Sequence, residues 1–297
     1  MKILLLGANG QVGHELRRGL APLGETIFAT RIGILDGKAC EQADFDLPDS
    51  LPVLIERIAP DVVVNAAAYT AVDRAESEPD AAFRANAESP ARLAEACAGS
   101  GALLVHYSTD YVFDGESSRP YREEDTTGPL GVYGRTKLAG EQAIRNSGCR
   151  HLIFRTAWVY GNYGANFMRT MLRLGSERDE LRVVTDQLGT PTPARLIADV
   201  TATVLQGNPR HSGVWHLTAT GETSWHGFAV EIFRQASASG LIDRAPRVTP
   251  IATSEYPTPA RRPRYSCLDT TRLKEAFGID LPDWKKALEQ VLDTSPR

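Results

Sequence analysis

The chain has 297 residues, 42% of them hydrophobic and 24% charged, which is ordinary for a globular protein that buries a substantial core. Its net charge of −4 leaves no basic footprint for nucleic acid or an anionic membrane surface. The opening apolar run stops at Gly7 and no segment approaches the roughly 20 apolar residues of a membrane span, so we expect a cytoplasmic protein.

Short apolar strands alternate with helical patterns through the first half of the chain. We expect strands at 2–7, 25–31, 61–68, 102–110 and 151–161, and helices at 11–20, 51–60, 79–101 and 133–148. This alternation indicates a parallel, doubly wound sheet, and near-continuous apolar strands are typical of a sheet covered on both faces. The sequence therefore predicts an α/β protein of the Rossmann type.

The pattern becomes less regular after Gly161. We expect helices at 165–175, within 189–208 and at 223–240, strands at 181–187 and 213–219, and loop character over 247–273. We predict a dinucleotide-binding domain over 1–164, to which 189–220 returns. The ranges 165–188 and 221–297 then form mainly a smaller α/β substrate-binding lobe.

The stretch GANGQVG follows the first strand and opens the first helix, with glycines at Gly7, Gly10 and Gly13. Glycine permits a tight turn and a close approach to a pyrophosphate, whose negative charge a helix N-terminus favours. A plain glycine turn is the alternative. The position between a strand and a helix at the chain start favours the dinucleotide site.

The end of the second strand bears on the choice of cofactor. An NAD-specific site usually has an acid there, whereas this chain has Thr30 and Arg31. A cation can bind the 2′-phosphate of NADP, so we predict NADPH, with NADH as the alternative. An Arg31 that simply points into solvent is the other interpretation. Asp44 and Phe45 follow a short third strand, where a carboxylate and an apolar side chain could meet an adenine.

Small and hydroxyl side chains follow two further strands. Ala66 and Ala68 lie in NAAAYT, where small residues let a cofactor lie against the sheet edge, although a close-packed core also favours alanine. Ser108, Thr109 and Asp110 end another strand, and their hydroxyls could bond a reacting carbonyl. A capped loop is the alternative there.

Tyr133 and Lys137 lie four positions apart, on one face of an expected helix. A nearby ammonium lowers the pKa of a phenol from about 10, so Tyr133 could donate a proton to a carbonyl oxygen at neutral pH. Lys137 could also bond the nicotinamide ribose. An ordinary amphipathic helix is the alternative, but the order of glycine turn, small residues, hydroxyls and this pair makes chance a poor explanation.

Together these motifs resemble the extended short-chain dehydrogenases/reductases and, within them, the dTDP-4-dehydrorhamnose reductase family. The similar stretches span almost the whole chain and include GANGQVG, PDVVVNAAAYTAVDRAE, HYSTDYVFDG, YGRTKLAGE, WVYG and DQLGTPT. The resemblance implies that NADPH reduces the C4 keto group of dTDP-4-dehydro-L-rhamnose to give dTDP-L-rhamnose.

The resemblance also implies roles for individual residues. Tyr133 would protonate the oxyanion, Lys137 would tune Tyr133 and hold the ribose, and Thr109 would bond the substrate oxygen. Asp110 and Trp158 match positions that line the sugar site, although Trp158 could equally be a core aromatic. Cofactor-contact positions are matched by Gly10, Gln11, Val12, Asp44, Phe45, Ala68, Tyr69, Thr70 and Tyr107.

Metal and phosphate binding are less strongly indicated. Some members of the family bridge a dimer through Mg²⁺; Glu15 fits such a role, but Arg195 stands where a second acid is expected. We therefore predict no metal site and a monomer or weak homodimer. The cysteines have no CxxC spacing, so neither a zinc site nor a redox pair is indicated. The arginines of 261–264 either clamp the substrate diphosphate or form a solvated charge run.

Two other functions remain open. The chain could be a non-catalytic nucleotide-binding regulatory subunit of the same fold, but such a protein often loses the catalytic pair, which is present here. It could also be a reductase, epimerase or dehydratase that acts on another nucleotide sugar. Epimerases and dehydratases keep a tightly bound NAD, so a purified protein without cofactor would count against them.

Overall fold

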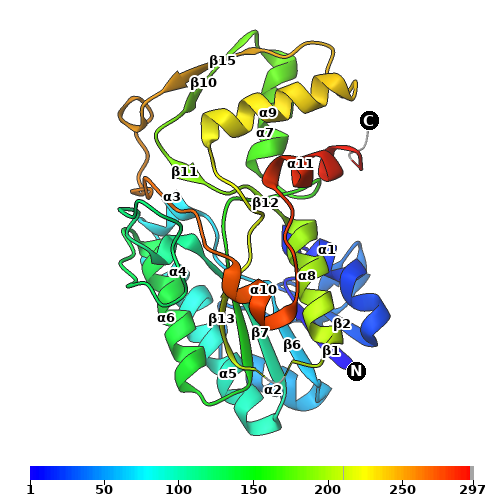
Figure 1. Cartoon of the computed structure of the whole chain (residues 1–297). Coiled ribbons are helices and arrows are strands. Elements are labelled where there is room, and N and C mark those ends of the chain that lie inside the picture. Colours follow the sequence, from blue (N-terminus) through cyan, green and yellow to red (C-terminus); the bar gives the residue numbers. More distant parts are fainter. Residues whose placement is uncertain (210, 295–297) are drawn as a thin grey trace.

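The computed structural model describes residues 1–209 and 211–294, and its centre is a seven-stranded sheet in which all neighbouring strands are parallel (Figure 1). The spatial order is β13 (Gly213–His216), β8 (His151–Thr156), β7 (Leu103–Thr109), β6 (Val62–Asn65), β1 (Lys2–Leu6), β2 (Glu25–Thr30) and β5 (Glu41–Gln42). The order reverses between β1 and β6, where a doubly wound sheet opens its ligand crevice. The predicted Rossmann-type fold is confirmed.

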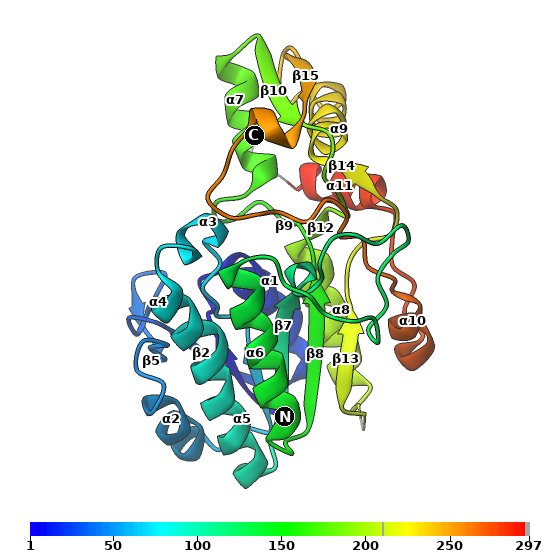
Figure 2. The same ribbon diagram turned by 90° about the vertical axis from the view of Figure 1, so that its left-hand side faces the viewer.

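Helices cover both faces of this sheet (Figure 2). One face is covered by α1 (Gln11–Leu20) and α8 (Ala194–Gln206), with α10 (Thr271–Phe277) beside β13. The other face is covered by α2 (Ser50–Ile58), α5 (Ser89–Ser100) and α6 (Val132–Asn146). Because both faces are covered, β1 and β6 are almost wholly apolar rather than alternating, whereas β7 and β8 also carry buried polar side chains.

A smaller lobe lies above the carboxyl ends of the strands (Figure 1). It holds α7 (Phe167–Glu177), α9 (Trp225–Ala238) and α11 (Trp284–Leu292), which bury a separate core that includes Met168, Phe228, Phe233 and Leu288. Its strands pair as β10 (Glu180–Val184) with β15 (Arg247–Ile251), β11 (Leu188–Gly189) with β14 (Thr223–Ser224), and β9 (Val159–Tyr160) with β12 (Thr192–Pro193).

The segments assigned to the two predicted domains divide between the sheet and the lobe. Both α8 and β13, from the range 189–220, pack on or within the seven-stranded sheet. The range 221–297 supplies α9 and α11 to the lobe, whereas its α10 buries Leu273 in the core beside the sheet. Residues 295–297 of that range lie outside the described residues, and the domain boundaries themselves stay a prediction.

Several elements differ from their predicted form. The strand expected at 151–161 ends at Thr156, because Trp158 adopts a left-handed backbone with φ of 46° and turns the chain into the lobe. The range 247–273 contains β15 and α10 as well as loops; Pro250 is tolerated because β15 has only one partner strand.

Two helical regions add detail that the periodicity did not show. The helix expected at 79–101 is divided into α4 (Pro79–Phe83), a π-helical turn over Arg84–Glu88, and α5. Before it stands the short α3 (Val72–Ala75). A hairpin of β3 (Ile34–Leu35) and β4 (Lys38–Ala39) follows β2.

Gly13 lets α1 start close to the turn that precedes it. A Cβ at this position would lie 2.0 Å from the carbonyl oxygen of Gly7, which is backbone and cannot move aside. We expect Gly13→Ala to lower the free energy of unfolding by about 1–3 kcal/mol in urea titrations. Gly99→Ala is the matched control, because a Cβ there meets nothing within 4 Å. Equal effects of the two substitutions would contradict this account.

Candidate active site

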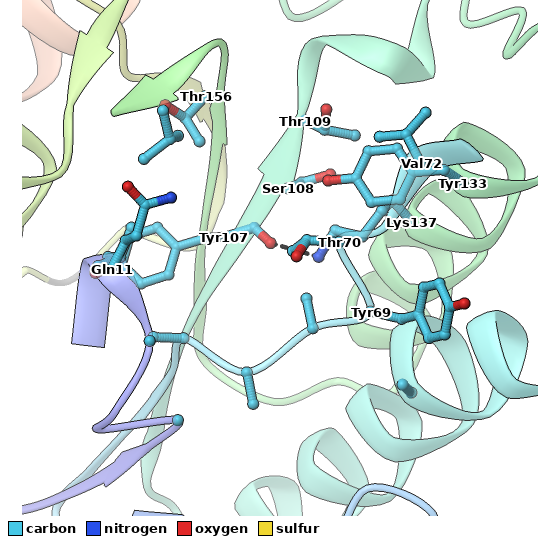
Figure 3. Close-up of a pocket in the computed structure, with 18 of the residues that line it drawn as sticks. Gln11, Tyr69, Thr70, Val72, Tyr107, Ser108, Thr109, Tyr133, Lys137 and Thr156 are labelled. Carbon is cyan, nitrogen blue, oxygen red and sulfur yellow. Dashed lines mark hydrogen bonds between the residues drawn. The ribbon is translucent and has the colours of Figure 1, made fainter. Parts of the chain in front are cut away.

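A cavity of about 800 Å³ opens at the carboxyl ends of β1, β6, β7 and β8, beneath the lobe. Figure 3 shows Ser108, Thr109 and Tyr133 gathered at the end of β7, with Thr156 at the end of the neighbouring β8. The sequence-predicted residues on its wall are Gly7, Gly10, Gln11, Val12, Arg31, Asp44, Phe45, Ala66, Ala68, Tyr69, Thr70, Tyr107, Thr109, Asp110, Tyr133, Lys137 and Trp158.

Two predicted cofactor residues are not on this wall. Gly13 packs so closely behind the glycine turn that a Cβ at this position would meet the Gly7 carbonyl. Thr30 is fully buried, and its hydroxyl donates to the Ile34 carbonyl at 3.0 Å while accepting from the Ile34 N–H at 3.1 Å. The expectation that Thr30 contacts a cofactor is therefore corrected: its side chain closes the turn after β2.

The glycine turn fits a diphosphate. Gly7 has φ of 75°, and a Cβ there would lie 2.7 Å from the Ala67 nitrogen, so the turn runs tightly against the end of β6. Gly10 begins α1 without a side-chain cap, and the first turn of α1 carries no acidic residue. Because Gly10, Gln11 and Val12 line the cavity, the partial positive charge of this helix end acts there.

Arg31 sits at the far end of the cavity among carboxylates. Its guanidinium is 2.6 Å from Asp46 and 3.7 Å from Asp44, and 71% of its side chain is exposed. The guanidinium is exposed enough to contact a solute in the cavity, but two acids compete for it. Phe45 is buried beside them, and its carbonyl accepts from Ser89.

Lys137 is directed at β7 rather than at solvent. Its Nζ donates to the Tyr107 carbonyl at 2.6 Å and lies 3.3 Å from His106 Nε2. Burial lowers the pKa of Lys137 to about 8, although the Glu141 carboxylate acts in the opposite direction. The lysine thus loses its charge just above neutral pH.

The pKa of Tyr133 moves opposite to the prediction. Burial raises it to about 12; the Thr109 hydroxyl partly offsets this, and the Asp110 carboxylate adds to it. The expected lowering by Lys137 was wrong, because burial of the phenol dominates its pKa and Lys137 Nζ donates to the Tyr107 carbonyl on β7. The phenol therefore stays protonated at neutral pH, which is the state that a proton donor needs.

Two buried polar atoms at the cavity wall make no hydrogen bond of normal geometry within residues 1–209 and 211–294: Asp110 Oδ2 and Thr156 Oγ1. The other Asp110 oxygen accepts from Thr109 at 3.0 Å. Burial raises the pKa of Asp110 to about 6, while the Ser266 and Thr109 hydroxyls limit the rise. Because buried polar atoms are normally paired, these two indicate a polar ligand.

Some wall residues were missed by the sequence analysis. Thr156 was hidden within the strand expected at 151–161, and Tyr111 packs edge-on to Tyr133 with ring centroids 5.5 Å apart. Trp225 from α9 stacks on Trp158, with centroids 3.5 Å apart. No local pattern marks Trp225, because only the packing of the lobe brings it to the site.

A buried ion pair stands behind the site. Arg155 on β8 binds Glu141 on α6 through two contacts of 2.9 and 2.7 Å, and neither side chain is more than 3% exposed. The Ser108 hydroxyl donates to the same carboxylate. The network ties the end of β7 to α6 and to β8 at Ser108, directly before Thr109.

Several arginines outside the cavity are paired with carboxylates. Arg262 binds Asp73 through contacts of 3.0 and 2.8 Å, and Arg261 lies 3.9 Å from Glu116. Arg195, on the helix α8 that packs against α1, lies 3.6 Å from Asp199. In the part of the chain that the structure describes, no three His, Cys, Asp or Glu side chains gather as a metal site would require. Nor is any described helix long and apolar enough to cross a membrane.

The fold and the site define a nicotinamide-dependent oxidoreductase with a Rossmann sheet, a glycine turn and a tyrosine–lysine pair. A family model described as the RmlD substrate binding domain matches residues 1–296, and the chain belongs to this family.

Known members of the family are similar over their whole length. The dTDP-4-dehydrorhamnose reductase of Burkholderia thailandensis is 51% identical over 299 residues, which cover 97% of each chain. The enzyme of the same name from Shigella flexneri is 46% identical and covers 99% of this chain and 97% of its own. The structure of dTDP-4-dehydrorhamnose reductase from Bacillus anthracis in complex with NADP has a TM-score of 0.90, 33% identity and 99% coverage of both chains.

Proposed function

We propose that this protein reduces the C4 keto group of dTDP-4-dehydro-L-rhamnose to give dTDP-L-rhamnose, with NADPH as the reductant. The observation that carries the proposal is the convergence of Thr109, Tyr133 and two unpaired polar atoms at one cavity wall, beside a glycine turn. The names of the relatives and the NADP complex of the Bacillus anthracis protein support the choice of substrate and cofactor.

The residues present fit the cofactor. The N-terminus of α1 would hold the diphosphate and Arg31 the 2′-phosphate, while Ala66 and Ala68 leave room at the sheet edge. NADPH, when bound, supplies the hydride that forms the new C–H bond at C4. Lys137 would bond the nicotinamide ribose.

The chain's own groups then complete the reduction. As the C4=O π bond breaks, its electron pair moves to oxygen, and Tyr133 donates its phenolic proton to that oxygen. Thr109 positions the oxygen by a hydrogen bond, and a charged Lys137 stabilises the phenolate that is left. Asp110 and Thr156 would bond sugar hydroxyls with their unpaired atoms, and Trp158 would bound the sugar pocket.

The test is turnover of the enzymatically generated keto sugar. We expect NADPH to be consumed in equal amount with the appearance of dTDP-L-rhamnose, identified by chromatography against the authentic nucleotide sugar. NADPH binding without turnover would instead indicate another nucleotide sugar or a non-catalytic regulatory subunit. Cytoplasmic location, oligomeric state and independence of Mg²⁺ stay predictions of the sequence.

Cofactor choice gives a separate prediction. We expect Arg31→Ala to raise the KM for NADPH about tenfold and to change the KM for NADH much less, because only NADPH loses a charge-assisted contact. Steady-state kinetics with both cofactors measure this, and Arg173→Ala, in an exposed pair with Glu177, is the control. An equal change for both cofactors would show that Arg31 does not bind the 2′-phosphate.

A further inference from the structure

A chain of hydrogen bonds runs beneath the catalytic pair, from β6 through β7 to α6. His106, in β7, is fully buried, and its Nδ1 lies 3.0 Å from the side-chain nitrogen of Asn65 on β6. Its Nε2 lies 3.3 Å from Lys137 Nζ on α6. None of the roles given above to the site residues uses His106 or Asn65.

The direction of this chain is set at Asn65. The Asn65 side-chain oxygen accepts from the Ala67 backbone N–H at 3.1 Å, so its nitrogen is the atom that faces His106. An amide nitrogen only donates, and His106 Nδ1 must therefore accept. Burial, with Lys137 nearby, holds the pKa of His106 well below its usual range, so the ring is neutral and carries its proton on Nε2.

The consequence falls on Lys137. The His106 Nε2–H points at Lys137 Nζ, and an ammonium has no lone pair with which to accept it. A neutral amine can accept from His106 and still donate to the Tyr107 carbonyl at 2.6 Å. The three bonds are thus satisfied together only when Lys137 is uncharged.

We propose that Asn65 and His106 are positioning residues that favour the neutral amine of Lys137 over its ammonium. At a pH where the amine is neutral, the site must take up a proton before Lys137 can stabilise the Tyr133 phenolate. The requirement for this proton uptake in turnover rests on the proposed reductase function. The direction of the hydrogen bonds is independent of that function.

Other ionisable groups around the amine do not remove this constraint. Glu141, one turn along α6, favours the charged amine but is itself bound by Arg155 from β8. Tyr133 on α6 and Tyr107 on β7 are phenols whose pKa burial raises, so both are uncharged near neutral pH. Asp110, beyond the end of β7, accepts from Thr109.

Asn65→Asp is the sharpest test, because it keeps the side-chain shape and replaces the donor by an acceptor. His106 should then carry its proton on Nδ1 and accept from a charged Lys137 through Nε2. ¹⁵N NMR of histidine-labelled, cofactor-free protein reports the ring tautomer directly. The chain has six histidines, and the His106 signals are those missing from His106→Gln. We expect the proton on Nε2 in the wild type and on Nδ1 in the variant.

The pH profile supplies a second readout. A charged Lys137 is present below its pKa and lost above it, so kcat/KM of the wild type should fall as the pH rises through about 8. Asn65→Asp should raise the pKa of Lys137 and move this limb upward by about one pH unit. Asn65→Leu, which provides neither donor nor acceptor, should give a smaller shift.

The outcomes separate this proposal from the proposed function. A wild-type His106 that carries its proton on Nδ1, or that is an imidazolium at pH 7, would overturn the proposal even if neither Asn65 variant folds. A folded Asn65→Asp variant in which the His106 tautomer and the alkaline limb of the kcat/KM profile are unchanged would also overturn the proposal. Failure of the wild type to turn over the keto sugar would instead contradict the proposed function, while the NMR result would still decide the direction of the hydrogen bonds between Asn65, His106 and Lys137.

Discussion

Tyr133→Phe is expected to lower kcat by about 10²–10⁴-fold while leaving the Kd for NADPH nearly unchanged. The substitution removes only the phenolic O–H, and the ring still packs edge-on against Tyr111. Its raised pKa of about 12 keeps Tyr133 protonated at neutral pH, and transfer becomes favourable only toward the strongly basic oxyanion. Single-turnover reduction of the keto sugar and fluorescence titration with NADPH measure the two effects separately.

Tyr256→Phe is the matched control, because Tyr256 is 61% exposed and does not line the cavity. It should leave kcat unchanged. If Tyr133→Phe kept more than a tenth of the wild-type kcat, the proton would come from another group, and Asp110 would be the first to test. With a pKa of about 6, however, Asp110 is mostly ionised at pH 7 and is then an acceptor.

The larger part of the fold was predictable because its signals are local and repeated. The central strands are rich in apolar residues, the long helices have an apolar face, and Gly7, Gly10 and Gly13 mark the turn between the first two elements. The lobe was harder, because several of its strands contain only two residues and exist through pairing with distant segments, as β9 does with β12. Trp158, whose left-handed backbone ends the strand expected at 151–161, is not marked by any pattern in the residues around it.

The candidate site was predictable to the extent that parallel strands end at one edge of the sheet. Thr109 and Asp110 therefore meet the glycine turn although about a hundred residues separate them. The directions in which the side chains point were not predictable. Spacing placed Tyr133 and Lys137 on one helical face, but only the packing of α6 on β7 shows that Lys137 is directed at the Tyr107 carbonyl. Trp225 reaches the cavity from the lobe, without any pattern in its own segment.

The second prediction with a large effect concerns the buried ion pair behind Ser108. Glu141→Leu is expected to lower the free energy of unfolding by about 3–5 kcal/mol, because it leaves the Arg155 guanidinium buried without its partner. The Ser108 hydroxyl loses its acceptor as well. Chemical denaturation measures the loss. Glu177→Ala is the control, because it breaks the exposed pair with Arg173 and should cost under about 1 kcal/mol.

The double variant Glu141→Leu with Arg155→Met distinguishes charge from packing. It removes both ions, so it should be more stable than Glu141→Leu alone, even though Arg155 also lies over the Phe113 ring at 5.1 Å. If the double variant is no more stable than the single one, packing and hydrogen bonding to Ser108 dominate, and the desolvated charge is not the cause. Ser108 directly precedes Thr109, so a change at Ser108 would displace Thr109, which would then position the C4 oxygen poorly for Tyr133. We therefore expect both variants to lower kcat while the Kd for NADPH changes little.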